Sequence, residues 1–258
     1  MFDRSLDVNG FEVRARYTRR TVAEVLEPLC GLMSGLHART GRPLVVLMAA
    51  PPGAGKSTLA QALAMLSRPT RTAAVGMDGF HYPAAYLAAH CDGAGRPLAS
   101  IKGAPETYDL PQLRAALGQL LTGRADWPVY DRRLHDVAAE PLRLCADVFI
   151  VEGNWLLLDE PGWRELRAGA ALSISLTADE ELLLPRLIAR KVRGGMDEAA
   201  ARAFCLRSDL DNIRRQRAHL LPADVALRVS EAEGGIELAP LGPMPSIGQL
   251  HDMLTGRA

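Results

Sequence analysis

The stretch from residue 44 to residue 58, LVVLMAAPPGAGKST, constrains the fold more than any other part of the chain. An apolar, largely β-favouring run ends at a turn rich in proline and glycine, and LAQAL then follows at helical spacing. A phosphate-binding loop requires this order of strand, loop and helix. The backbone N–H groups of small residues turn toward phosphate oxygens there, and the N-terminus of the helix faces the same anion.

The residues of this loop predict how a triphosphate is held. We expect Lys56 to reach the β- and γ-phosphates and the Ser57 hydroxyl to bind Mg²⁺. The usual pattern, G-x-x-x-x-G-K-[ST], has glycine where this chain has Ala50, so the first turn is expected to differ in shape, helped by the fixed φ of Pro51 and Pro52. The alternative is a glycine-rich turn whose lysine is only solvated. The predicted nucleotide-binding residues are Pro52, Gly53, Ala54, Gly55, Lys56, Ser57 and Thr58.

Charge and cysteine usage limit the classes of partner. Thirty acidic and thirty basic residues are interspersed, and the formal net charge is zero. A nucleic-acid-binding protein usually carries a basic stripe, so we predict no nucleic-acid partner. The four cysteines lie far apart without a C-x-x-C pair, which favours small, buried, reduced thiols and a cytoplasmic location. No apolar run approaches ~18 residues, so no membrane partner is expected.

Apolar runs alternate with helical patterns along the chain. Strands are predicted at 44–49, 72–77, 146–151, 172–176 and 225–229, and a helical stripe covers 21–39. This alternation predicts an α/β fold with a doubly wound, mostly parallel sheet. We predict one domain with an N-terminal helical extension (1–43), a core (44–229) that includes a lid at about 186–220, and a C-terminal tail (230–258).

Two carboxylates follow predicted strands. Asp78 ends the second strand, where it could accept the proton of an attacking hydroxyl; its alternative is a turn-forming aspartate before Gly79. Glu152 ends the strand at 148–151, where an acidic residue commonly holds Mg²⁺; its alternative is an ordinary carboxylate at the end of a strand. The guanine-reading N-K-x-D motif is absent, which disfavours a GTPase.

Four segments after the loop carry a resemblance to a known family. They are DGF at 78–80, KGAPETYDL at 102–110, PVYD at 128–131 with DV at 136–137, and IVEGN at 150–154. Their order resembles bacterial pantothenate kinase of the P-loop type, within the uridine kinase and phosphoribulokinase superfamily, which includes fructose-transport-system and nucleoside/nucleotide kinases. The resemblance covers about 44–229. It implies a P-loop NTPase three-layer sandwich, ATP and Mg²⁺ as cofactors, a small-molecule hydroxyl acceptor and Asp78 as the base, with a homodimer as an open alternative.

The same resemblance implies an acceptor pocket around Tyr130. The substrate residues that we predict are His81, Tyr108, Tyr130, Arg132, His135 and Asn154. Pantothenate kinases have a histidine, and uridine kinases a phenylalanine, where this chain has Arg132. A guanidinium suits a carboxylate, a phosphate or a polyhydroxyl group, so we expect a sugar or a small acidic metabolite rather than a nucleoside or pantothenate. Alternatively, Arg132 and Arg133 pair with nearby aspartates on a solvated loop.

Three arginines recur at spacings of four and three. Arg186, Arg190 and Arg193 therefore share one helix face, and the glycines at 194–195 could form a hinge. The resemblance implies a lid whose arginines neutralise charge as the γ-phosphoryl moves, with Arg190 and Arg193 as catalytic residues beside Asp78 and Lys56. The alternative is a solvated face paired with glutamates at 180–181. A function of another class, a P-loop ATPase or a nucleotide-binding regulatory protein, also stays open.

Overall fold

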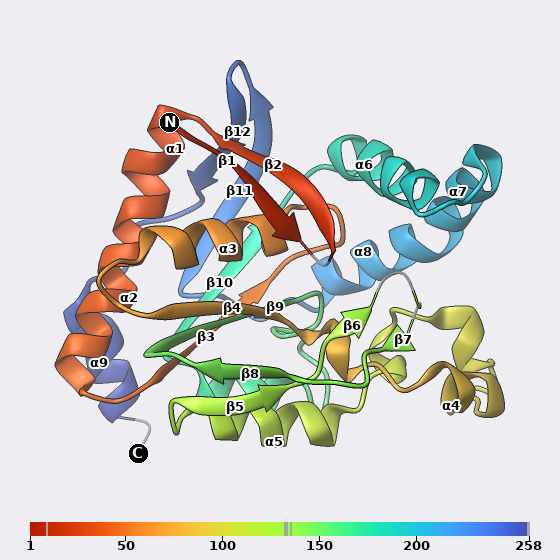
Figure 1. Cartoon of the computed structure of the whole chain (residues 1–258), viewed down its shortest axis with the longest axis horizontal. Helices are drawn as coiled ribbons and strands as arrows, with labels where there is room; N and C mark the ends of the chain where they lie inside the picture. The colour runs from red at the N-terminus through yellow and green to blue at the C-terminus, as the bar shows by residue number, and fades with distance from the viewer. Residues whose placement is uncertain (9, 132–133, 135, 257–258) are drawn as a thin grey trace.

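The central sheet of the computed structural model, which describes residues 1–8, 10–131, 134 and 136–256, has a parallel core in the order β11-β10-β3-β9-β4. Figure 1 shows this sheet crossing the middle of the molecule. The core strands are β3 (Leu44–Ala49), β4 (Thr72–Gly76), β9 (Val148–Gly153), β10 (Leu172–Thr177) and β11 (Val225–Ala232). Each predicted strand is present, and the pairing of β3 with β9 and β10, and of β4 with β9, is parallel, as predicted.

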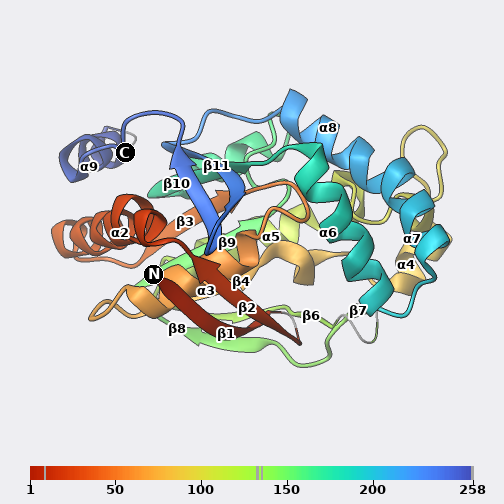
Figure 2. The same cartoon turned by 90° about the horizontal axis from the view of Figure 1, so that it is seen from above.

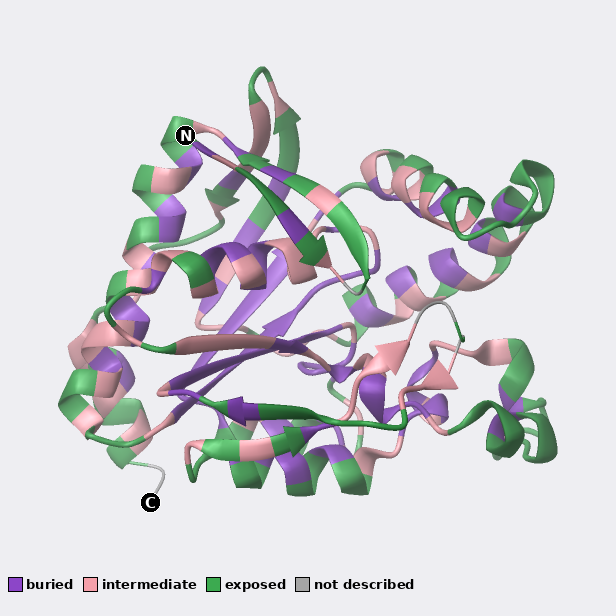
Figure 3. Ribbon diagram, viewed as in Figure 1, coloured by how far each residue is buried: buried purple, intermediate pink, exposed green. Residues whose placement is uncertain are grey.

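The middle strand, β3, is buried on both faces, which explains its uninterrupted apolar run. Leu44, Val46 and Met48 belong to one hydrophobic core, and the alternate residues, Val45, Leu47 and Ala49, belong to the other. Figure 3 shows the buried residues concentrated along these strands and on the helix faces turned toward them. The sheet is therefore the middle layer of three.

Helices cover both faces of the sheet (Figures 1 and 2). The first core is closed by α2 (Glu27–Thr40), α3 (Lys56–Leu66) and α9 (Ile247–Thr255). The second is closed by α5 (Leu110–Leu120) and by the two-stranded sheet of β5 (Arg124–Trp127) and β8 (Leu142–Cys145). The predicted three-layer α/β sandwich is confirmed.

A helical arm, residues 180–218, stands at the end of the molecule opposite α2 and α9 (Figure 2). It consists of α6 (Glu180–Arg193), α7 (Glu198–Phe204), a π-helical turn (Cys205–Asp209) and α8 (Leu210–Ala218). Lys191 joins α6 to α7 and to the π-helical turn, because its Nζ lies 3.3 Å from an Asp209 carboxylate oxygen and 3.9 Å from the centre of the Phe204 ring. The predicted helix break at 194–195 is present, and the Asp197 side chain caps α7.

The expected N-terminal helical extension is wrong for the first seventeen residues. β1 (Phe2–Val8) and β2 (Phe11–Tyr17) form an antiparallel hairpin, and helix begins only at α1 (Arg19–Thr21) and a π-helical turn (Val22–Leu26). The physical reason is a period of two: Phe2, Leu6, Ala15 and Tyr17 are buried in the core that α3 closes, whereas the residues between them are mostly exposed.

The C-terminal segment also extends the sheet. β11 continues to Ala232 and turns into β12 (Gly235–Pro240), which runs antiparallel to it and lies beside β2. The predicted C-terminal helix is present as α9. The irregular excursion between residues 82 and 107 contains α4 (Ala84–Ala89) and 3₁₀ turns at Leu98–Ile101 and Pro105–Thr107, and β6 (Tyr130–Asp131) pairs with β7 (Asp136–Val137).

All four cysteines are free thiols, but the expectation that they are buried holds only in part. Cys205 is buried and Cys30 is partly buried, whereas Cys91 and Cys145 are exposed on loop and edge-strand positions. Within the described residues, no helix combines the length and the apolar character needed to span a bilayer.

Candidate functional site

The phosphate-binding loop leaves β3 and enters α3 at Lys56, as predicted. Gly53 and Gly55 have φ of +85° and +87°, the left-handed region that favours glycine. The N–H of Ala50 donates to the carbonyl of Gly153 at 3.3 Å, so the strand pairing continues through this residue. Ala50, which stands where the usual pattern has its first glycine, therefore extends the regular strand pairing by one residue, and the loop bends only after Ala50.

Ser57 and Glu152 meet at the carboxyl end of the sheet. The Ser57 Oγ donates to Glu152 Oε1 at 2.7 Å, and Glu152 is only 7% exposed. Hydroxyl and carboxylate oxygens are ligands that Mg²⁺ prefers, and this ion commonly takes its remaining ligands from phosphates and water. The described residues contain no cluster of three or more His, Cys, Asp or Glu suited to a metal. The hydroxyl and carboxylate oxygens of this pair fit a magnesium ion.

Asp78 lies in a 3₁₀ turn (Met77–Phe80) directly after β4. The Tyr108 hydroxyl donates to Asp78 Oδ1 at 3.3 Å, and His81 Nδ1 lies 2.9 Å from the carbonyl oxygen of Asp78. The His81 ring lies 3.9 Å from the Tyr108 ring and 5.5 Å from the Tyr130 ring, between centroids. The fold thus brings together four of the predicted residues from three separate segments.

A cavity of about 520 Å³ opens beside Asp78, and we call it the acceptor cavity. Asp78, Ser57, Glu152 and Tyr130 line it together with Gln61. Its lining also includes Asp7 and Gly10, from the end of the hairpin, and no motif in the sequence indicates that these two residues belong to the site.

Of the other five predicted substrate residues, the structure describes three, and none of the three lines the acceptor cavity. His81 and Tyr108 are buried, at 9% and 3% exposure, and do not line this cavity. His81 contacts the carbonyl oxygen of Asp78, and Tyr108 contacts its carboxylate. Asn154 does not line the cavity either, and its Oδ1 is buried without a hydrogen bond among the described residues. The predictions for Arg132 and His135 lie outside the residues that the structure describes.

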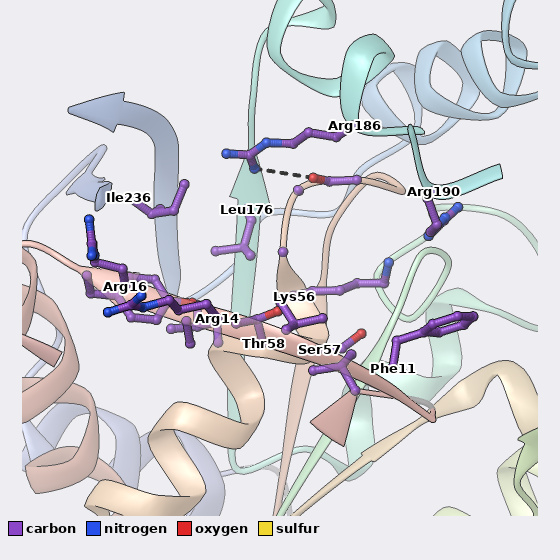
Figure 4. A pocket seen from close by; sticks show the side chains of 18 of the residues that line it. Phe11, Arg14, Arg16, Lys56, Ser57, Thr58, Leu176, Arg186, Arg190 and Ile236 are labelled. Atoms are coloured by element: carbon purple, nitrogen blue, oxygen red, sulfur yellow. Dashed lines mark hydrogen bonds between the residues drawn. The ribbon is translucent and has the colours of Figure 1, made fainter. Parts of the chain in front are cut away.

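A second cavity, of about 310 Å³, borders the phosphate-binding loop (Figure 4), and we call it the nucleotide cavity. Its walls are the loop from Gly53, the start of α3, the arginines of α6 and a face of the hairpin β1–β2. Ser57 lines both cavities. A phosphate at Ser57 would therefore stand where the two cavities meet.

The predicted arginine face of α6 does turn toward the loop. Arg186, Arg190 and Arg193 all line the nucleotide cavity. Arg186 donates to the Gly53 carbonyl at 3.4 Å and to Glu231 Oε1 at 2.8 Å, and Figure 4 shows Arg190 on the same side of the cavity as the Lys56 amine. Glu180, the partner in the alternative interpretation, pairs instead with two arginines of α8, Arg214 and Arg217.

Arg215, on α8, anchors the arm to the body of the protein. It donates two hydrogen bonds to the Glu160 carboxylate, at 2.9 and 2.6 Å, and one to Glu106 Oε1, at 2.8 Å. These bonds hold the pKa of Glu160 below its usual value and raise the pKa of Arg215. Glu106 belongs to the KGAPETYDL segment, so one guanidinium connects that segment with the arm.

Comparison with known proteins identifies relatives of this chain. No family model matches the chain. The Escherichia coli protein YggC, whose own function is uncharacterised, is 38% identical over 231 residues, which is 88% of this chain and 95% of YggC. A crystal structure from Silicibacter sp. TM1040, provisionally named a fructose transport system kinase, is 35% identical with a TM-score of 0.71; the match covers 78% of this chain and 98% of that one.

More distant matches agree with the fold. A pantothenate kinase from Bradyrhizobium is 33% identical over 155 residues, which is 55% of this chain and 47% of that enzyme, so the match spans about half of the pantothenate kinase. The D-glycerate 3-kinase of Cryptococcus neoformans shares the fold, with a TM-score of 0.63 at 17% identity over 84% of this chain. The chain belongs to the family of YggC and the Silicibacter kinase, within the P-loop kinases, and it is similar to pantothenate kinases over about half of their length.

Proposed function

We propose that the protein is an ATP-dependent small-molecule kinase that transfers the γ-phosphoryl group to a hydroxyl of a sugar or a small acidic metabolite. The observation that carries the proposal is that Asp78 lines the same cavity as Ser57 and Glu152. A carboxylate, a hydroxyl that can meet a phosphate and a magnesium-compatible acid thus face one space, which has the volume of a small-molecule site.

We assign the role of the base to Asp78. The acceptor oxygen forms a bond to the γ-phosphorus while the bond between that phosphorus and the bridging oxygen of ADP breaks, and the hydroxyl proton passes to the Asp78 carboxylate. The Tyr108 hydroxyl, hydrogen-bonded to Asp78 Oδ1, would restrain the orientation of the carboxylate.

The negative charge of the triphosphate requires compensation. Lys56 and Arg190 stand on the same side of the nucleotide cavity in Figure 4, and Arg193 lines the same cavity. Mg²⁺, held by Ser57 and Glu152 when bound, would screen the phosphate oxygens. We therefore assign Lys56, Arg190 and Arg193 to charge stabilisation during transfer.

The acceptor class rests on the cavity and on one relative. Gln61, Tyr130 and Asp7 offer polar groups suited to a hydroxylated molecule, and the Silicibacter relative is named for a fructose system. The guanidinium of Arg132, by residue type, extends the class to small acids. The matches to pantothenate kinases make pantothenate the second candidate.

An acceptor panel tests the proposal. ADP release from MgATP is measured with sugars, glycerate, nucleosides and pantothenate, and stimulation above background by one compound is expected. Asp78→Asn should lower that stimulated rate roughly 10²-fold or more while nucleotide affinity stays nearly unchanged. Asp126→Asn, an exposed aspartate on β5, is the matched control.

Two results would count against the proposal. Full stimulated turnover in Asp78→Asn would remove Asp78 as the base. If no compound stimulates ADP release, the other class is favoured, in which water meets the γ-phosphate of an ATPase or a regulatory protein.

A further inference from the structure

The hairpin β1–β2 forms one wall of the nucleotide cavity. Along β2, Phe11, Val13, Ala15 and Tyr17 line the cavity from one face of the strand, and Val8 joins them from β1. Ile236 and Leu238 of β12 and Leu176 of β10 continue this apolar lining. A nucleoside entering the cavity would therefore contact a largely apolar surface made by strands of the sheet extension.

The hairpin is fixed in place by the core. The N–H of Thr18 donates to the Ile236 carbonyl at 3.3 Å, and the N–H of Leu238 donates to Thr21 Oγ1 at 3.0 Å. Phe2 and Leu6 are buried in the core that α3 closes. The hairpin can therefore serve as a preformed wall.

The meeting of the two cavities sets the direction of a bound nucleotide. Ser57 is the described residue that lines both, and Asp78 lies in the acceptor cavity. A triphosphate whose γ-phosphorus faces Asp78 must extend away from it, into the nucleotide cavity. Figure 4 shows Lys56 and Arg190 toward one end of that cavity and Ile236, Leu176 and Arg16 toward the other.

The apolar groups of the far end, rather than its arginines, suit a base. Arg14 and Arg16 both reach the Asp3 carboxylate, with Nε to oxygen distances of 2.8 and 3.3 Å. Asp3 is paired with Arg16 in the register of the hairpin, so these three side chains share the face of the hairpin opposite to the apolar residues that line the cavity. A purine gains from apolar contact on its face, so the apolar lining of this end fits a purine base.

We propose that the hairpin and β12 form the base-binding wall of the nucleotide site, with Ile236 in contact with the base. The choice of ATP as the nucleotide rests on the proposed function. The hairpin thereby gains a role in holding the nucleoside, in addition to the phosphate contacts of the loop.

Calorimetric titration with MgATP and with magnesium tripolyphosphate tests this wall, because tripolyphosphate has no base. Wild-type protein should bind ATP at least about tenfold more tightly than tripolyphosphate. Ile236→Ala should weaken ATP binding about fivefold, the scale of one or two methylene contacts, and leave tripolyphosphate binding unchanged.

Control variants separate the base from the phosphates. Met65→Ala, at an exposed apolar position of α3 outside both cavities, should change neither affinity. Lys56→Ala should weaken the binding of both ligands. Ile236→Leu keeps the apolar volume and should keep most of the ATP affinity, provided that its melting temperature matches that of the wild type.

Three outcomes would overturn the inference: equal wild-type affinities for the two ligands, equal weakening of both by Ile236→Ala, or unchanged ATP affinity in that variant. The titrations need no acceptor, so they stand apart from the test of the proposed function. A protein that binds ATP through this wall but phosphorylates nothing would contradict the proposed function alone. Normal acceptor-dependent turnover, together with an ATP affinity that does not change in Ile236→Ala, would contradict the base-binding wall alone.

Discussion

Two glycines flank Asp78, and each is required by a close approach of another group. A Cβ on Gly76 would lie 3.0 Å from Glu152 Oε1, and a Cβ on Gly79 would lie 2.0 Å from the Pro128 carbonyl oxygen. The first glycine lets the Glu152 carboxylate lie beside β4, and the second lets the Asp78 turn pack on the PVYD segment. At the residue scale, these contacts place two carboxylates in one cavity.

Glu152→Gln should weaken the binding of ATP in the presence of Mg²⁺. The substitution keeps the shape of the side chain but removes the charge that would meet the ion, so we expect about a tenfold loss of MgATP affinity. ATP affinity measured in EDTA should not fall. Glu140→Gln, at an exposed loop position, should behave as wild type. Equal MgATP affinities in wild type and Glu152→Gln would contradict the magnesium assignment.

The four cysteines should fall into two groups that react at different rates with a thiol reagent. Cys91 and Cys145 are exposed, whereas burial raises the pKa of the Cys205 thiol to about 12 and also raises the pKa of Cys30. Only a thiolate reacts quickly, so a thiol reagent at pH 8 should label two groups rapidly in the native protein and four after unfolding. Peptide mapping identifies the labelled positions, and fast labelling of Cys205 would show that its surroundings are open.

At the element scale, the arm depends on the contact that Arg215 makes with Glu160 and Glu106. The folded-state pKa of Glu160 lies below its usual value of 4.5, so this pair stabilises the protein fully above about pH 4.5 and loses its effect as the pH falls through the folded-state pKa. Arg215→Met should therefore lower the melting temperature at pH 7, and the difference from wild type should shrink below about pH 4.5.

Arg164→Met gives the matched comparison for this experiment. Arg164 pairs with Asp159 at 3.1 Å, but both side chains are about half exposed, so the pair should contribute little at any pH. If the Arg215→Met difference stays constant down to pH 3, the ion pairs do not stabilise the arm.

Some elements could be predicted from the sequence because their pattern is local. The β3 run, the glycine loop and the α6 arginine spacing each depend on neighbours within about fifteen residues. Glu231, the partner of Arg186, could not be predicted in this way, because it lies 45 residues further along the chain. The same limit applies to the hydrogen bond between Tyr108 and Asp78, which lie 30 residues apart in the sequence. Only the family resemblance indicated that both residues belong to the site.

The hairpin was missed for a related reason. Its inward residues alternate, but Arg4 interrupts the apolar positions of β1, and β2 finds its sheet neighbour, β12, more than 200 residues away. Alternation in Phe11–Tyr17 was the signal that could have indicated a strand. Nothing in the local sequence indicated which edge of the sheet it would join.

At the scale of the whole molecule, a bound nucleotide should contact segments that lie far apart in the sequence. The nucleotide cavity takes residues from the hairpin, the loop, α6 and β12. A non-hydrolysable ATP analogue should therefore slow amide hydrogen exchange in all four segments together, whereas α5, which lies on the opposite face of the sheet, should exchange as before. Protection confined to the phosphate-binding loop would contradict this expectation.

The hydrogen bond between Leu238 and Thr21 spans 217 residues of sequence, and it has a consequence for the order in which the protein is made. At ~5–20 residues per second, a ribosome would complete the hairpin and the phosphate-binding loop on the order of ten seconds or more before β12 is synthesised. ATP could not gain its full contact with a nascent chain during that interval. Nucleotide would therefore stabilise the finished protein, and a chain stalled before β12 would lack that protection.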